Sequence, residues 1–237
     1  MIVDNKKDWS IYADLYSKYR ILGTPFLPYR DMPVILDKYS NGKNALDYGC
    51  GTGESTLFLK SLDYDVISVD INDKMLEIAN KRDPNGNYIK INTGVLPFNE
   101  DTFDLVFCSF VLLEISTKEE ILNIIDQINR VLKNGGIFIS ISATEQTYKR
   151  QWLTLNTNFT ENKKIASGSK VRMHFKDINL TIYDYYWTEE DYIQIFQSAG
   201  LRIEEIYKPL GKDSDGYEWK DEKLFSPSSI FICKKIS

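Results

Sequence analysis

The chain of 237 residues has little cysteine, a single histidine and no long apolar run. The three cysteines, Cys50, Cys108 and Cys233, lie far apart within apolar stretches and indicate reduced thiols rather than a disulfide framework or a structural zinc site. The longest apolar run, residues 105–113, falls short of the roughly 18 residues that a membrane-spanning helix needs. The first eight residues are too charged for the apolar core of a signal peptide. We therefore expect no membrane partner, no metal and a cytoplasmic location.

Positive charge is also in deficit, because 29 Lys and Arg residues face 34 Asp and Glu residues, which gives a net charge of −5. An acidic chain lacks the general attraction to phosphate backbones that non-specific nucleic-acid binding needs, so nucleic acid is a disfavoured partner. The chain is nevertheless 43% hydrophobic and 13% aromatic, which is typical of a folded globular protein. This composition excludes disorder, collagen and coiled coil.

Short β-rich runs alternate with helix-length amphipathic segments over residues 44–200. The alternation is typical of a parallel α/β sheet whose strands are joined by helical crossovers. The predicted strands span residues 45–48, 66–70, 88–91, 104–109 and 137–142, and the predicted helices span residues 54–62, 74–81 and 119–133. After a further helix at residues 188–199, the runs 201–207 and 229–234 have no helix between them. We expect these two runs to pair as an antiparallel hairpin at a sheet edge.

Two segments do not follow this alternation of strands and helices, and both are expected to lie over the sheet. The first, residues 1–40, is rich in aromatic side chains and predicts an N-terminal lid. The second is an insertion at residues 143–187. The chain is then a single domain with its core at residues 41–142 and a C-terminal helix and hairpin at residues 188–237.

A glycine-rich loop follows the first predicted strand and opens directly into a helix, with the sequence Asp47-Tyr-Gly49-Cys-Gly51-Thr-Gly53. Such a loop lets a ligand approach the backbone closely and exposes the positive end of the helix. The second strand ends in Asp70, 23 residues after Asp47, where a carboxylate can accept hydrogen bonds from ribose hydroxyls. The pattern indicates an adenosine-containing cofactor.

The spacing of the glycines narrows the choice of cofactor. The dinucleotide fingerprint G-x-G-x-x-G would need glycine at position 54, where Glu54 would instead oppose a diphosphate. Asp47 adds a second acid, which suits a cationic ligand or an amino group better than a diphosphate. No Gly-Lys-Ser/Thr follows the glycines, which excludes a P-loop.

Four ordered motifs resemble those of the class I S-adenosylmethionine-dependent methyltransferases, of the small-molecule type. Residues 45–53, 68–76 and 92–104 resemble the family's first three motifs, and residues 131–136 resemble the turn before its fifth strand. The resemblance implies an α/β fold with a Rossmann-like, doubly wound seven-stranded sheet, an antiparallel C-terminal hairpin, an N-terminal helical lid and an insertion after strand five. It also implies S-adenosylmethionine as cofactor and S-adenosylhomocysteine as product, with residues 41–142 as the cofactor-binding core.

The resemblance carries roles for the loop and for the second strand. Gly49, Gly51 and Gly53 are implied to pack against the methionine part of the cofactor, and Asp47 to lie near its amino group. Asp70 is implied to accept from the two ribose hydroxyls.

The adenine is implied to lie between Ile71 and Met75, with its edge against Asn92 and Thr93. The family usually has Asp where this chain has Asn92, whose amide oxygen can still accept from the exocyclic amine. Additional cofactor contacts are expected from Phe110, Tyr12 and Tyr16.

The acceptor is expected beyond the carboxyl end of the fourth strand, where residues 107–114 would face the sulfonium. The Asn-Pro-Pro-Tyr motif of amino-methylating DNA enzymes is absent, and Leu113 and Glu114 stand where many small-molecule members have a histidine pair. Glu114 and His174 are therefore the candidate catalytic bases, the latter because its ordinary pKa suits proton removal near neutrality. A structural role stays open for both, since an amine acceptor needs no strong base.

Aromatic residues of the lid and the insertion are candidate walls of an acceptor pocket. Ring faces can hold a sulfonium or a cationic amine in a cavity from which water is excluded, although aromatic rows are more often plain core. The predicted substrate residues are Tyr29, Tyr148, Trp152, Tyr183 and Trp187. The insertion holds seven Lys or Arg against four Asp or Glu, 7 − 4 = +3, which suits an anionic acceptor or merely a solvated face.

The sequence thus predicts an enzyme that transfers the methyl group of S-adenosylmethionine to an O or N atom of a small-molecule acceptor. Two alternatives stay open: a methyltransferase that acts on RNA or protein, and a non-catalytic S-adenosylmethionine-binding module. The first predicts that six cationic residues of the insertion gather around the pocket, namely Lys149, Arg150, Lys163, Lys164, Lys170 and Arg172. The sequence leaves open the acceptor's identity, O, N or C methylation, and a monomer or a homodimer.

Overall fold

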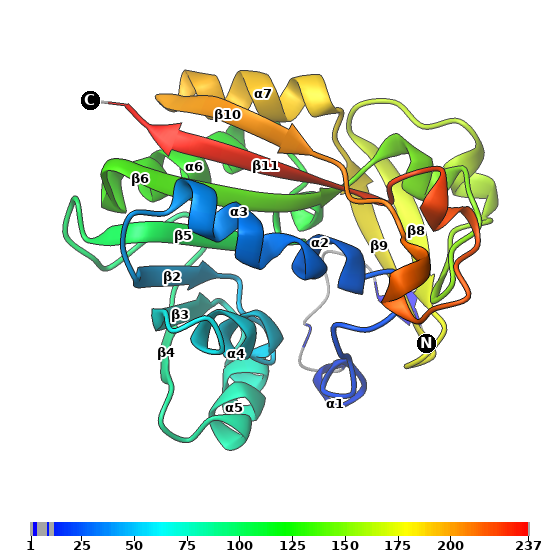
Figure 1. Ribbon diagram of the computed structural model, residues 1–237, viewed down its shortest axis with the longest axis horizontal. Helices are drawn as coiled ribbons and strands as arrows, with labels where there is room; N and C mark the ends of the chain where they lie inside the picture. Colours follow the sequence, from blue (N-terminus) through cyan, green and yellow to red (C-terminus); the bar gives the residue numbers. More distant parts are fainter. Residues whose placement is uncertain (1, 4–8, 10–11, 237) are drawn as a thin grey trace.

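The computed structural model describes residues 2–3, 9 and 12–236, and its centre is a seven-stranded sheet in the order β10-β11-β6-β5-β2-β3-β4 (Figure 1). Neighbouring strands pair in parallel from β6 to β4. These five strands are β2 (Asn44–Tyr48), β3 (Asp65–Asp70), β4 (Asn87–Lys90), β5 (Phe103–Ser109) and β6 (Leu132–Ala143). The predicted Rossmann-like, doubly wound sheet is confirmed.

The C-terminal strands β10 (Leu201–Tyr207) and β11 (Ser228–Lys235) complete the sheet. β11 lies between β6 and β10 and is antiparallel to both, which confirms the predicted antiparallel pairing at the sheet edge. The connection between them, residues 208–227, is longer than a hairpin turn and carries two short 3-10 turns, η5 (Asp213–Asp215) and η6 (Asp221–Lys223). It is long because it reaches the insertion, where the Asp221 N–H donates to the carbonyl oxygen of Gln151 at 3.1 Å.

Helices cover both faces of the sheet because alternate side chains of each strand point to opposite sides and both sides are apolar. In β5, Val106 and Cys108 belong to the core beneath α6 (Lys118–Val131) and α7 (Glu189–Ser198). Leu105 and Phe107 belong to the opposite core, which α2 (Phe26–Arg30), α3 (Met32–Tyr39) and α4 (Glu54–Lys60) complete. The predicted helices are present, with ends shifted by one or two residues, and α5 (Asp73–Arg82) packs on β3 and β4.

The insertion forms a sheet of its own. β7 (Leu155–Asn156), β8 (Ser169–Phe175) and β9 (Leu180–Tyr186) pair antiparallel, and β1 (Ile2–Val3) adds a parallel strand on β9. Figure 1 shows this second sheet beyond one end of the main sheet, with α1 (Ala13–Tyr16) nearby. The lid and the insertion are therefore joined by strand pairing, which the hydrophobic pattern did not predict. The short turns η3 (Glu145–Tyr148) and η4 (Thr160–Lys163) complete the insertion.

A buried carboxylate ties three distant segments together at this end of the molecule. Glu222 is fully buried and accepts from the Thr24 hydroxyl at 2.8 Å, the Leu153 N–H at 2.6 Å and the Lys220 N–H at 2.8 Å. Since a buried carboxylate needs such donors, the lid, the insertion and the C-terminal connection are fixed relative to one another.

Three further observations concern the described residues alone. Among them, no helix has the length and apolar character to cross a membrane. No cluster of three or more His, Cys, Asp or Glu side chains suited to a metal ion occurs there either. All three cysteines are free and buried.

Candidate functional site

One cavity of the molecule borders the topological switch point of the sheet. The chain passes from β4 at one edge to β5 on the other side of β2, so the carboxyl ends of β2 and β5 diverge where such folds bind ligands. A cavity of about 350 Å³ lies there, walled by the loop after β2, the ends of β3 and β5, the segment after β4, α5 and the N-terminal segment. Its size falls in the range typical of small-molecule sites.

The loop after β2 presents backbone rather than side chains to this cavity. Gly49, Gly51 and Gly53 have φ angles of +75°, +52° and +87°, in the left-handed region that favours glycine. A Cβ at Gly49 would lie 2.4 Å from Cγ2 of Val111, so a side chain there would collide with the loop after β5. Gly49 and Gly51 line the cavity, and Gly53 lies beyond them as the N-cap of α4.

Asp70 is held in a fixed orientation at the cavity wall. Its Oδ2 accepts from the Gly51 N–H at 2.8 Å and its Oδ1 from the Asn72 N–H at 2.9 Å. Burial raises the pKa of Asp70, and these backbone donors oppose the rise. Asn72 also caps α5 by accepting from the Met75 N–H at 3.1 Å. Four residues of the predicted adenosine site therefore line the cavity together: Asp70, Ile71, Met75 and Thr93.

Asp47 is buried beneath the glycine loop. Its Oδ2 accepts from the hydroxyls of Ser55 and Thr56, both at 2.7 Å, whereas its Oδ1 has no hydrogen-bond partner among the described residues. Burial raises the pKa of Asp47 to about 6. An acceptor buried without a donor is costly.

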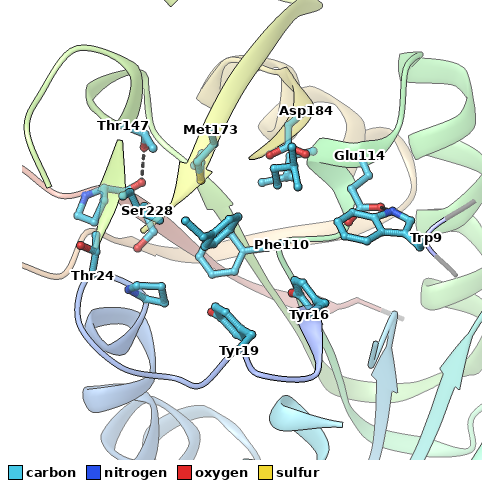
Figure 2. Close-up of a pocket in the computed structure, with 17 residues that line it drawn as sticks. Trp9, Tyr16, Tyr19, Thr24, Phe110, Glu114, Thr147, Met173, Asp184 and Ser228 are labelled. Atoms are coloured by element: carbon cyan, nitrogen blue, oxygen red, sulfur yellow. Dashed lines mark hydrogen bonds between the residues drawn. The ribbon is translucent and has the colours of Figure 1, made fainter. Parts of the chain in front are cut away.

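A second, smaller cavity of about 60 Å³ shares part of the wall of the first (Figure 2). The shared residues are Trp9, Tyr16, Phe110 and Glu114. The rest of its lining comes mainly from apolar and aromatic side chains of the lid and the second sheet. Within the described part of the chain, the lining holds two carboxyl groups, Glu114 and Asp184, and no Lys, Arg or His.

Phe110 lies between the two cavities and has a strained backbone. Its φ of +57° places a bulky residue in the left-handed region, and its N–H donates to the carbonyl oxygen of Ile141 at 2.9 Å. Such strain persists only where surrounding structure enforces it, and it is concentrated at functional sites. Figure 2 shows the ring near the middle of the smaller cavity.

Both carboxyl groups of the smaller cavity have raised pKa values. The Trp9 indole N–H donates to Oε2 of Glu114 at 3.0 Å. Burial, with added repulsion from Asp184 and Asp70, raises the pKa of Glu114 well above its usual range. Asp184 is 1% exposed, and burial raises its pKa to about 8. Among the described residues, no hydrogen-bond partner reaches Oδ1 of Asp184.

The sequence-based prediction of the site missed Trp9 and Asp184. A signal for Asp184 was present, because β9 places Leu180, Ile182, Asp184 and Tyr186 on one buried face. A single acid in an inward-facing apolar row is unusual in a plain core. Trp9 had no local signal beyond its place in an aromatic segment.

His174, a candidate base, lies outside both cavities. Met173 and Phe175 line the smaller cavity, so alternation along β8 directs the intervening His174 to the opposite face. Its Nδ1 is 2.9 Å from the Thr181 hydroxyl oxygen, and partial burial lowers its pKa. Glu114, the other candidate, lines both cavities.

Several other predicted site residues line neither cavity. From the predicted cofactor set these are Asp47, Gly53, Asn92 and Tyr12, and from the predicted substrate set they are Tyr29, Tyr148, Trp152, Tyr183 and Trp187. Trp152 is buried, and its indole N–H donates to the carbonyl oxygen of Thr147 at 2.7 Å. Tyr183 lies on the outer face of β9, with Nζ of Lys170 at 4.9 Å from its ring centroid. Most of these aromatic residues fill the core beside the pocket.

The six cationic residues of the insertion do not line either cavity. Lys149 pairs with Glu145 at 2.5 Å, and the guanidinium carbon of Arg150 lies 3.7 Å from the ring centroid of Phe225. The positive bias of the insertion therefore belongs to its outer surface and supplies no charge to the pocket.

Comparisons with known proteins agree with this geometry. A family model described as "Methyltransferase domain" matches residues 46–140, which include most of the residues around the larger cavity. A demethylmenaquinone methyltransferase of Staphylococcus aureus (strain JH9) is 30% identical over 191 residues, which cover 76% of this chain and 78% of that protein. An uncharacterized methyltransferase of Synechocystis is 36% identical over 110 residues, 46% of this chain and 51% of that protein. The chain spans about half or less of the length of the first curated relatives it matches.

Solved structures share the fold. The CcbJ methyltransferase from Streptomyces caelestis aligns with a TM-score of 0.67 at 15% identity, over 99% of both chains. Fold, motifs and relatives together show that the chain belongs to the class I S-adenosylmethionine-dependent methyltransferases. The resemblance seen in the motifs is confirmed, and the cofactor of this family is S-adenosylmethionine.

Proposed function

We propose that this chain transfers the methyl group of S-adenosylmethionine to a nitrogen or oxygen atom of a small-molecule acceptor. The observation that carries the proposal is the wall shared by the two cavities, one at the glycine loop and the other beneath the second sheet. A small, mostly apolar second cavity suits a small molecule better than RNA or protein. The printed name of the Staphylococcus aureus relative, a demethylmenaquinone methyltransferase, also supports a small acceptor.

The residues around the larger cavity fit the cofactor. The backbone of Gly49 and Gly51 would hold its methionine part, and Asp70 would accept from the ribose hydroxyls with the lone pairs that Gly51 and Asn72 leave free. Ile71 and Met75 would flank the adenine. The unpaired Oδ1 of Asp47, beneath the loop, matches the cationic amino group in charge.

Bound S-adenosylmethionine supplies an electrophilic methyl group on a sulfonium, so the hardest part of the chemistry belongs to the cofactor. The residues of the chain align the acceptor and exclude water. Trp9, Tyr16 and Phe110 stand at the junction of the two cavities, where ring faces favour a cation. Glu114 lines the same junction and would take a proton from the acceptor.

Calorimetric titration of S-adenosylmethionine and S-adenosylhomocysteine into the wild type and Asp70→Ala tests the cofactor site, with NAD as a control ligand. We expect micromolar binding of both sulfur ligands and a loss of about 100-fold in Asp70→Ala, because two hydrogen bonds to a charged group disappear. Asp73→Ala removes a nearby exposed carboxylate and is expected to leave the affinity unchanged. Binding of NAD, or failure of both sulfur ligands to bind, would contradict the proposal.

Formation of S-adenosylhomocysteine with a metabolite panel, an RNA pool and a protein extract tests the transfer itself. Product from the metabolites alone is the expected result. Product from RNA or protein alone would favour the polymer-directed alternative. Binding without any product would favour a non-catalytic module.

A further inference from the structure

We propose that the acceptor is an amine on a small apolar body, and that Asp184 and Glu114 bind its ammonium group and take its proton. This inference rests on the proposed function and names the acceptor class. It starts from two carboxyl groups that line one apolar cavity, Asp184 from β9 and Glu114 from the turn after β5 (Figure 2).

One carboxyl oxygen of Asp184 has no donor within the part of the chain that the structure describes. The side chain is 1% exposed and borders the smaller cavity, and its Oδ1 accepts no hydrogen bond from any described residue. Leaving a buried carboxyl oxygen without a donor costs about 1–3 kcal/mol or more. A ligand with N–H or O–H groups at this point would remove that cost.

The charges around the cavity favour a cation over an anion. Its described lining has two acids and no basic side chain, so a carboxylate or phosphate acceptor would find no positive charge to balance its own. The choice between an amine and a hydroxyl follows from the number of donors. A hydroxyl donates one hydrogen bond and can satisfy only one of the two carboxyl groups, whereas an ammonium donates up to three and can satisfy both.

The aromatic walls point the same way. The rings of Tyr16 and Tyr19 stack with centroids 5.3 Å apart, and Trp9 meets Tyr16 edge-on at 5.5 Å. These three residues line the cavity with Phe110 and Phe175. Ring faces attract cations and cover apolar substrate carbon, which suits an amine on an apolar body.

The proton affinities of the two acids fit proton removal near neutrality. Burial raises the pKa of Asp184 to about 8 and that of Glu114 well above its usual range. The titratable groups around the pair include Asp70, the Cys108 thiol and the phenols of Tyr16, Tyr148 and Tyr192. Burial keeps the thiol and the phenols neutral by raising their pKa values. A carboxylate of raised pKa is a stronger base toward an ammonium.

The step balances without any further reactant. The ammonium gives one proton to a carboxylate oxygen, which frees the nitrogen lone pair. The nitrogen then forms a bond to the methyl carbon while the bond from carbon to sulfur breaks, and that electron pair stays on sulfur. S-adenosylhomocysteine and a methylated ammonium leave, and the carboxyl proton passes to solvent.

Titration of matched probes in the presence of saturating S-adenosylhomocysteine tests the acceptor class. The probes are 2-phenylethylamine, 2-phenylethanol and 3-phenylpropanoate, with tryptamine, tryptophol and indole-3-propionate as a larger set. We expect each amine to bind about tenfold or more tightly than its alcohol, since charge-assisted hydrogen bonds are stronger, and the acids not to bind. Asp184→Asn should weaken amine binding about tenfold and alcohol binding far less.

Matched variants separate this effect from misfolding. Glu114→Gln keeps an oxygen for the Trp9 indole and should also weaken the amines selectively. Asp177→Asn removes the same charge from an exposed position of the insertion and should leave all affinities unchanged. Amine binding to the wild type should release protons, seen in buffers of different ionisation enthalpy, and this release should fall in Asp184→Asn.

The outcomes show whether the amine acceptor or the proposed methyltransferase function itself is wrong. If S-adenosylhomocysteine binds but the alcohols bind as tightly as the amines, the acceptor class is wrong and a hydroxyl acceptor is favoured. If S-adenosylhomocysteine binds and neither amine does, the inference is also overturned while the cofactor site stands. If S-adenosylhomocysteine itself does not bind, the proposed function fails first.

Discussion

Phe110 combines a bulky ring with a left-handed backbone, and the two features can be separated by mutation. Its φ of +57° costs a non-glycine residue about 1–2 kcal/mol, whereas glycine adopts the same conformation freely. We predict that Phe110→Gly is more stable than Phe110→Ala by about 1 kcal/mol, because both lose the ring and only the first relieves the strain. Urea denaturation of the two variants measures this difference. Equal stabilities would mean that the backbone is not held in the left-handed region.

Asp184 makes the stability of the fold depend on pH with a definite sign. Burial raises its pKa to about 8, so between about pH 4 and pH 8 the folded chain holds a proton that the unfolded chain has lost. The stability contributed by this group is therefore full below pH 4 and declines as the pH rises toward 8. Asp47, with its pKa raised to about 6, acts in the same direction over a narrower range.

We predict that Asp184→Asn reduces this decline. Relative to the wild type, the variant should gain stability from pH 5 to pH 9, because the amide never has to ionise in the buried site. Denaturant melts at several pH values measure the difference, and exposed Asp177→Asn is the charge-matched control. A constant offset between Asp184→Asn and the wild type at all pH values would contradict the prediction.

At the scale of elements, one arginine of the cofactor-binding core contributes to holding the lid. Arg82 at the end of α5 donates to Oε1 of Glu54 at 2.8 Å and to the carbonyl oxygen of Thr52 at 3.0 Å, and it also donates to the carbonyl oxygen of Ser17. Ser17 directly follows Tyr16, which lines both cavities. Glu54, whose charge would repel a diphosphate at the glycine loop, therefore also helps to hold the lid through its hydrogen bond with Arg82.

We predict that Arg82→Met raises the KM for S-adenosylmethionine about tenfold with a smaller change in kcat, because loss of the Arg82 contacts frees the segment that carries Tyr16. Initial-rate measurements over a range of cofactor concentrations give both values. Lys81→Met is the control, since Lys81 is exposed and pairs with Glu77 on its own helix face. An unchanged KM in Arg82→Met would show that the lid is held by other contacts.

The sequence predicted the elements of the main sheet but not those of the second. Short β-rich runs identify β2, β3 and β5 locally, and the glycine loop fixes where a helix must begin. β9 carries a clear alternation of inward and outward side chains, yet its neighbours are β8 and the N-terminal β1, and β1 is more than 170 residues away in the chain. Pairing over such a distance leaves no trace in a local pattern, so composition alone predicts only an aromatic cover here.

At the scale of the whole molecule, local sequence patterns predict the larger cavity much better than the smaller one. Most residues of the larger cavity come from one stretch, where motif spacing predicted Gly49, Gly51, Asp70 and Met75. The smaller cavity brings together the lid, the second sheet and the C-terminal connection. Its chemistry depends on how those segments dock, so aromatic residues chosen by composition fell in the core.

Glu222 offers a test of that docking. Its carboxylate accepts from Thr24, Leu153 and Lys220, one from each of the three segments, and it is fully buried. Glu222→Gln keeps the shape but replaces one acceptor oxygen with a donor, so at least one of the three donors loses its partner. We predict a destabilisation of about 1–3 kcal/mol.

Which of the two ligand affinities falls in Glu222→Gln is more informative than the loss of stability. Since none of the three donors borders the cofactor cavity, Glu222→Gln should leave the affinity for S-adenosylhomocysteine unchanged while weakening the binding of 2-phenylethylamine. Calorimetry on folded protein measures both affinities, and Glu218→Gln, at an exposed position of the same connection, is the control. A parallel loss of both affinities would mean that the two cavities depend on one common packing unit. A loss confined to the amine would mean that the acceptor half is assembled separately, by contacts between segments that lie far apart in the chain.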